Sequence, residues 1–213
     1  MNSSILIPLR TAPEQTARLL ELQAAFADVC NAIAPIVQQS RCWNRVGLHH
    51  MVYRSMRERF PRVGSQMVCN AIYSVSRTCR TVYQSPNSPV ALSKRPGQPL
   101  PLLRFLSNAP VYFDRHTLSL KNRKLSMYTL DGRMQFALDL DPADEARFHT
   151  QKLREIVLGQ NSEGFHLIFE FVSASGDEPN YKDVANELPE YLLVTTGESA
   201  GMTEPRQLEQ VTG

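Results

Sequence analysis

The sequence lacks the signatures of most common catalytic and membrane-bound classes. No apolar run approaches the roughly 20 residues that a membrane-spanning helix needs, and no basic start leads into an apolar stretch. We therefore expect neither a signal peptide nor contact with a membrane. Glycine-rich phosphate loops and the GxSxG, HExxH and Cys–His patterns of catalytic sites are also missing. These absences favour a protein that binds rather than catalyses, and we expect neither enzyme activity nor a cofactor.

Cysteine is scarce and shows no metal-binding pattern. The four cysteines are Cys30, Cys42, Cys69 and Cys79. They form no CxxC pair and have no histidine at zinc-binding spacing. The adjacent His49 and His50 lack the carboxylate or cysteine neighbours of a metal site, so we expect a polar helix face there. The cysteines favour buried, reduced thiols in a cytoplasmic protein.

Positive charge is concentrated in the middle of the chain. Residues 41–133 carry 16 Lys and Arg against three acids, whereas residues 134–213 carry five against 15, so the net charge of +2 hides two opposite regions. An arginine-rich segment is typical of a polyanion binder, because each arginine placed on a phosphate releases a condensed counterion. The alternative is a solvated surface that happens to be basic.

Three helices are predicted before residue 86. The first follows a capping box of Thr11 and Glu14, and Pro35 should kink or end it. The second begins near Gly47, and the third spans residues 65–83 with an apolar stripe at three-to-four spacing.

Basic and aromatic side chains gather on single faces of the second and third helices. Arginines at helical spacing, with tyrosines nearby, suit phosphate contacts combined with base stacking. Further basic residues lie between two predicted strands. The candidate nucleic-acid-binding residues are His50, Arg54, Arg57, Tyr73, Arg77, Arg80, Lys121, Arg123 and Lys124.

Alternating patterns predict antiparallel strands after a proline-rich connector. Residues 110–140 read as strands with a period of two, and Asp131-Gly132 is a strong hairpin-turn signal. A second pair of strands follows over residues 151–158 and 164–172. The lone strand over residues 4–10 needs a sheet to join, and the later strands are its natural partners. We therefore expect an α+β fold in which a small antiparallel, oligonucleotide-binding-like β-barrel carries a three-helix domain inserted after the first strand.

Paired carboxylates follow the last strand of the first hairpin. Asp139/Asp141 and Asp144/Glu145 lie at a strand end and in a DPADE sequence. A metal-dependent nuclease needs carboxylates that converge from separate elements. We therefore expect a solvated turn and no catalytic or metal site.

Several segments, in order, resemble a known family. They are TAPEQTARLLELQAAFADVCNAI, GLHHMVYRSMRERFP, SQMVCNAIYSVSRTCRTV, APVYFDRHTLSLKNRKLSMYTLDGRMQFAL and GFHLIFEFV. Together with the first strand, they resemble the N-terminal half of the transposon-encoded TnpB proteins, relatives of the compact type V CRISPR effectors. The resemblance covers residues 5 to about 172 and implies a wedge β-barrel with an inserted helical recognition domain. It also implies binding of a guide RNA scaffold and of a short motif in duplex target DNA.

The resemblance divides the chain into four parts. They are a wedge-like barrel (1–11 and 105–175), a recognition domain (12–86), a proline-rich connector (87–104) and an acidic, partly flexible C-terminal segment (176–213).

The sequence departs from the family at the expected nuclease. The family's first catalytic aspartate lies in a motif like GVDLG, whereas residues 193–197 here read LVTTG, with Thr195 at the aspartate's position, and the sequence ends within sixteen residues. We therefore expect a nuclease-less module that binds a guide-type RNA and double-stranded target DNA. A nuclease or effector subunit on another chain would be its partner if the effector is split. The alternative is an RNA-independent DNA-binding regulator or adaptor protein.

Overall fold

The computed structural model describes residues 3–114, 116–121, 123–138, 140–172 and 188–195. This part of the chain combines helices with antiparallel sheets, so the expected α+β class is confirmed. The helices are α1 (Pro13–Ser40), α2 (Arg45–Arg59), α3 (Ser65–Gln84), the short η1 (Leu92–Lys94) and α4 (Pro142–Thr150). The strands are β1 (Ser3–Pro8), β2 (Leu102–Phe105), β3 (Val111–Phe113), β4 (Leu118–Lys121), β5 (Lys124–Thr129), β6 (Gly132–Ala137), β7 (Leu153–Asn161), β8 (Gly164–Phe171) and β9 (Leu192–Thr195).

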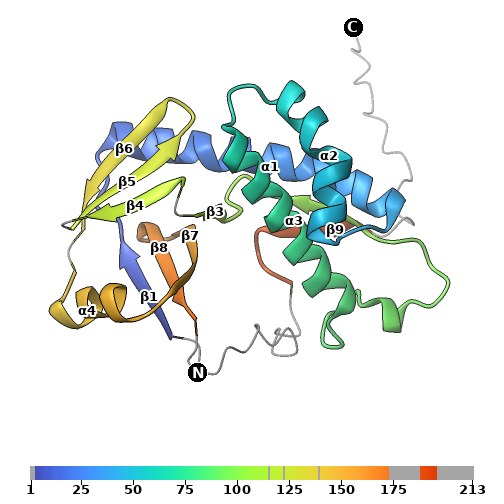
Figure 1. Cartoon of the computed structure of the whole chain (residues 1–213). Helices are drawn as coiled ribbons and strands as arrows, with labels where there is room; N and C mark the ends of the chain where they lie inside the picture. The colour runs from blue at the N-terminus through green and yellow to red at the C-terminus, as the bar shows by residue number, and fades with distance from the viewer. Residues whose placement is uncertain (1–2, 115, 122, 139, 173–187, 196–213) are drawn as a thin grey trace, which may run out of the picture.

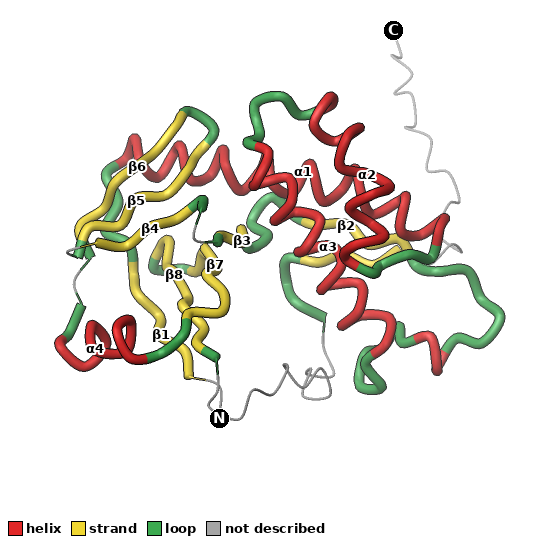
Figure 2. The backbone as a smooth tube through the Cα atoms, in the orientation of Figure 1, coloured by secondary structure: helices red, strands yellow, loops and turns green. Residues whose placement is uncertain are grey.

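Two lobes share the long helix α1. Figure 1 shows a strand-rich lobe with α4 on the left and a helix-rich lobe with α2, α3, β2 and β9 on the right, while α1 runs across both. The same arrangement is visible by secondary structure in Figure 2. Polar side chains of α1 fix this position, because Gln15 Nε2 donates to Gln135 O (3.1 Å) in one lobe and Asn31 Nδ2 donates to Phe105 O (2.8 Å) in the other.

Helix α1 begins slightly later than its expected cap. Pro13 occupies the first helical position, and the Ala12 N–H donates to Gln15 Oε1 (2.9 Å). The Thr11 hydroxyl instead lies 2.8 Å from the Thr16 hydroxyl. The expected capping box of Thr11 and Glu14 is therefore wrong by one residue, because proline needs the position whose N–H has no helical acceptor.

Pro35 does not end α1, which continues to Ser40. The neighbouring Ile33, Ala34 and Val37 are buried, and their packing outweighs the one backbone hydrogen bond that a proline removes. By length and composition α1 could cross a membrane, although it has no uninterrupted apolar run of that length; half of its most apolar stretch is buried inside the fold.

Strand β1 joins the late strands, as the periodicity predicts. The first sheet has the order β1-β8-β7-β3, with Ile5 opposite Phe169 and Ile7 opposite Leu167. In the sequence, helices α1, α2 and α3 therefore lie within an insertion between β1 and β3, the two edge strands of this sheet. The inward side chains of this sheet, such as Phe169 and Leu158, are fully buried in the shared core.

The second sheet follows the Asp131-Gly132 turn. It has the order β4-β5-β6, and Thr129 pairs with Gly132 at the turn. Gly132 has φ of 95°, a left-handed conformation that glycine adopts without a steric penalty. The predicted hairpin is confirmed.

The described sheets do not close into a barrel. Strand β6 leads into α4 instead of pairing with β1, so the first two sheets keep separate edges. A further two-stranded sheet, β2 with β9, lies in the helix-rich lobe, where Leu103 opposes Val194. The expectation of a β-barrel is therefore corrected. The sheets stay open because α4 follows β6 where a further strand pairing would be needed.

The sequence patterns did not predict two of the observed elements, α4 and β9. The DPADE segment is not a turn but the start of α4, since Asp141 caps the helix by accepting from the Asp144 N–H (2.7 Å). Strand β9 lies within the stretch expected to be acidic and weakly patterned. Residues 198–213, expected to be a flexible tail, lie outside the described residues.

Candidate nucleic-acid interface

Helix α2 lies at the start of the basic region of the sequence. Residues 41–62 carry six arginines and one acid. Asn44 caps the start of α2, because its Oδ1 accepts from the N–H groups of Val46 and Gly47 (both 3.1 Å). Leu48 and Val52 on one side are fully buried, so the opposite side faces solvent.

The exposed basic residues of this region define what we call the α2 surface. Its members are Arg41, Arg45, His50, Arg54 and Arg59, all of which are exposed. The Arg54 side chain is 94% exposed, and among the described residues it forms one ion pair, with Glu58 one turn along the helix (3.2 Å). Such an exposed pair contributes little to stability, so Arg54 can exchange Glu58 for a phosphate at small cost.

Tyr73 connects the α2 surface to the first sheet. The Arg45 guanidinium lies over the Tyr73 ring, 5.0 Å from its centroid, and the ring packs edge-on against Tyr112 (5.6 Å, 82°). The predicted base-stacking residue is therefore half-buried, with Arg45 against its ring. A base that approaches here meets the Arg45 guanidinium, which itself is a stacking surface.

Arg77 does not face solvent. Its Nη1 donates to Glu155 Oε2 on β7, and the two side chains are 24% and 5% exposed. Burial by itself lowers the pKa of Arg77. The nearby Tyr112 and Glu155 outweigh the effect of burial, so the pKa of Arg77 is raised above its usual range. Arg77 thus holds α3 against the first sheet, and its expected role in phosphate binding is not supported by this geometry.

A second carboxylate lies beside this ion pair. Glu170 on β8 is directly opposite Glu155 in the β7–β8 ladder. Burial, followed by the charge of Glu155, raises the pKa of Glu170, while Arg77 and Arg154 act against this rise. The cluster is a buried polar contact between lobes, and one of its oxygens, Glu155 Oε1, has no hydrogen-bond partner among the described residues.

Two other candidate arginines also serve the fold. Arg57 Nη1 donates to Val63 O and so fixes the loop between α2 and α3. Arg80 is half-buried and already interacts with another group of the protein. Both residues are half-buried and already interact with other groups of the protein.

The three basic candidates from the strands lie at the β4–β5 hairpin. Lys121 pairs with Lys124 across the hairpin, and both side chains are exposed. Arg123 has a left-handed backbone (φ 58°), and its Nη2 and Nε lie 2.7 and 3.1 Å from Glu145 Oε2 on α4. This pair lowers the pKa of Glu145 through the Arg123 hydrogen bond. The two lysines are therefore open to a ligand, and Arg123 is engaged.

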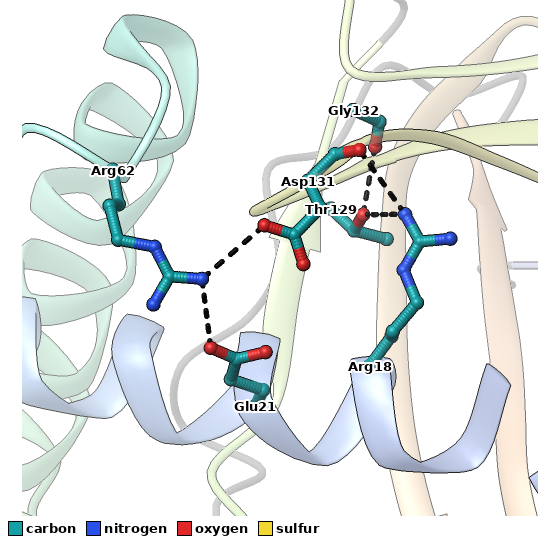
Figure 3. A network of polar contacts seen from close by, with 6 residues as sticks. All are labelled: Arg18, Glu21, Arg62, Thr129, Asp131 and Gly132. Carbon is teal, nitrogen blue, oxygen red and sulfur yellow. Dashed lines mark hydrogen bonds and ion pairs between the residues drawn. The ribbon is translucent and has the colours of Figure 1, made fainter. Parts of the chain in front are cut away.

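Arg62 and Arg18 attach the β5–β6 turn to the helices (Figure 3). Arg62 Nη2 contacts Glu21 Oε1 (2.9 Å) on α1 and Asp131 Oδ1 (3.3 Å) in the turn. Arg18 Nη2 donates to Thr129 Oγ1 (2.8 Å). Both arginines therefore connect the second sheet to α1.

The structure thus divides the candidates. It leaves His50, Arg54, Lys121 and Lys124 open, and it uses Arg57, Arg77 and Arg123 in contacts within the fold. Sequence reasoning missed Arg41, Arg45 and Arg59, because they do not share the i, i+4, i+7 face. The only available signal was the excess of arginine over acid around α2.

No protein-family model matches this sequence, and no curated protein is similar to it. The resemblance to the TnpB family therefore rests on the segments quoted above and stays a prediction.

Proposed function

We propose that this chain is a nucleic-acid-binding module that holds a structured, guide-type RNA on the α2 surface. The observation that carries the proposal is the excess of exposed arginines around α2. Residues 41–62 contain six arginines and a single acid, Glu58. Exposed guanidinium groups bind phosphates bidentately and release counterions, which supplies sequence-independent affinity for a folded RNA.

The position of the helices agrees with this proposal. The resemblance implies a helical domain inserted after the first strand of a wedge, and β1 does pair with β8 across such an insertion. We propose that the first and second sheets together take the place of the family's wedge, as two open sheets. Lys121 and Lys124 at the hairpin tip would then extend the RNA-binding surface to the strand-rich lobe.

Double-stranded target DNA is the second proposed ligand, recognised through the bound guide. The family's first nuclease carboxylate corresponds to Thr195, which lies opposite Leu102 in the sheet of β2 and β9. A threonine hydroxyl carries no charge to hold Mg²⁺, so the module is proposed to bind DNA without cutting it. In a split effector, cleavage would come from a nuclease on another chain.

Nucleic acid that co-purifies with the chain tests the proposal. The tagged protein is isolated from its own cells at low salt, treated with DNase or RNase, and the surviving nucleic acid is sequenced. A defined RNA of tens of nucleotides supports the proposal. Random fragments, or DNA alone, would contradict it and favour an RNA-independent DNA-binding regulator.

A further inference from the structure

A cleft with an apolar floor lies between the β4–β5 hairpin, α4 and the first sheet. Its volume is about 500 Å³, which is within the range of small-molecule sites. The floor consists of Leu118 and Leu120 of β4, Phe148 of α4, Ile156 of β7 and Phe169 of β8. Of the described residues that line this cleft, the proposed RNA binding uses Lys121 at the hairpin and none of the floor residues.

The cleft exists because α4 does not fill the space above the sheet. Phe148 is the anchor of α4, with its ring edge-on to Phe169 (5.0 Å, 83°) and Phe171 (5.3 Å, 73°). No residue of α4 is fully buried. Arg147 adds two contacts with the sheet, through its Nη2 to Ser4 O (3.4 Å) and its guanidinium over the Phe171 ring (5.5 Å). The apolar lining of the cleft remains between α4 and the sheet.

The mouth of the cleft is cationic. Among the described residues, Lys121 and Arg123 line it together with one acid, Glu145, and His149 also lines the cleft. Arg123 closes part of the mouth through its ion pair with Glu145 (2.7 Å). The side chains of Arg123 and Glu145 are 51% and 37% exposed. Lys121 makes no ion pair with any residue that the structure describes.

We propose that this cleft binds a small amphipathic anion, with its hydrocarbon body on the Leu118–Phe169 floor and its carboxylate at Lys121 and Arg123. The five floor side chains are hydrocarbon, and the uncharged polar side chains among the described lining residues are those of Ser119 and Gln151. A hydrocarbon body therefore fits this floor better than a nucleotide does. Burial of that body supplies the affinity, and the cationic mouth selects the sign of the charge. Binding shifts Arg123 from Glu145 to the ligand carboxylate.

Three probes with the same hydrocarbon chain test the proposal: decanoate, decanol and decylammonium, each below its micellar concentration. Affinities for the full-length protein are measured by calorimetry, with the shifts of Leu and Ile methyl resonances as a second readout. We expect decanoate to bind about threefold tighter than decanol, because an exposed charge pair contributes modestly, and decylammonium to bind weakest. Equal affinities for all three probes would overturn the proposal.

Two charge variants separate the contributions of the mouth. Lys121→Gln should weaken decanoate binding and leave decanol binding unchanged. Glu145→Gln should release Arg123 and tighten decanoate binding, again with no effect on decanol. A merely structural ion pair predicts the opposite result for Glu145→Gln, namely weaker binding of both probes as α4 loosens.

A bulky variant tests the floor. Leu120→Trp should fill the cleft and abolish binding of both decanoate and decanol. Gln135→Trp is the matched control, since it places the same side chain on an exposed position of β6 outside the cleft. Unchanged binding by a folded Leu120→Trp protein would contradict the proposal; if that variant does not fold, the charge variants and the three probes decide it.

Discussion

Helices α2 and α3 carry arginines at similar spacing, yet the two helices use them differently. Arg54 on α2 has a side chain that is 94% exposed and forms an ion pair with Glu58 on its own helix. Arg77 on α3 has a side chain that is 24% exposed and contacts Glu155 on another element. Arginine on α2 is therefore exposed and available to the proposed RNA, whereas arginine on α3 forms the contact between the lobes. Basic composition alone cannot separate these two roles, because the partner of each arginine is distant in the sequence.

The largest effect should come from breaking the buried contact on α3. Arg77→Met leaves the Glu155 carboxylate buried and unpaired, so the free energy of unfolding should fall by about 3–5 kcal/mol. Arg54→Met is the matched control and should change it by less than about 0.5 kcal/mol. Both are measured by urea denaturation. Adding Glu155→Gln to Arg77→Met should restore most of the lost stability, and equal losses in the two single variants would contradict the assigned roles.

The cap of α2 should have the next largest effect. Asn44→Ala removes the acceptor of two N–H groups and should cost about 1 kcal/mol of unfolding free energy. Asn44→Ser keeps a neutral acceptor and serves as the control. Because the cap orients the first turn of α2, which carries Arg45, RNA affinity should fall with Ala and not with Ser. Equal RNA affinity for both variants would mean that Arg45 does not contact the ligand.

Glu170 makes the same inter-lobe region sensitive to pH. Its pKa is raised above the ordinary 4.5 by burial and by Glu155, so the folded state holds this proton more tightly than the unfolded state. The stabilisation is complete below about pH 4.5 and is lost as the pH rises through the folded pKa. Glu170→Gln should therefore flatten this part of the stability profile and be more stable than the wild type at neutral pH. Chemical denaturation at several pH values measures the free energy of unfolding of both proteins. The same pH profile for Glu170→Gln and the wild type would contradict the raised pKa of Glu170.

The smallest effect should come from the exposed contacts in Figure 3. Arg62→Gln removes two ion pairs of side chains that are about half exposed, with Glu21 and Asp131. Water and salt screen such pairs, so the melting temperature should hardly move. Amide hydrogen exchange at residues 129–133 should nevertheless become faster, because the turn loses a contact with the helices. A large drop in melting temperature would show that this contact, and not Arg77, dominates the connection between the lobes.

The sequence predicts local patterns well and distant partners poorly. The apolar stripe of α3, the Asp131-Gly132 hairpin and the pairing of β1 with a late strand follow from periodicity and turn chemistry. Helix α4 could also have been predicted, since Asp141 followed by a proline and two acids is a helix-start signal. The Arg77–Glu155 pair could not, because 78 residues separate its members and only packing brings them together.

The candidate site shows the same limit. The excess of positive charge near α2 is visible in the sequence, but its division into open and engaged arginines is not. Arg57 and Arg77 fit the helical spacing that suggested phosphate contacts, and both donate instead to groups of the fold, Val63 O and Glu155. Arg45 does not fit that spacing and is exposed, beside Tyr73.

The salt dependence of RNA binding tests the central claim most directly. The variant Arg45→Gln, Arg54→Gln, Arg59→Gln removes three arginines of the α2 surface. The control Arg62→Gln, Arg123→Gln, Arg147→Gln removes the same charge from arginines outside it, each of which is in an ion pair. The affinity for the co-purified RNA is measured from low to moderate salt. Each lost phosphate contact should reduce the slope of log affinity against log salt by about 0.7–0.9, so the first variant should lose about 2–3 units of slope and the control almost none. Equal losses of slope in the two variants would contradict the claim that the open arginines around α2 form the RNA-binding surface.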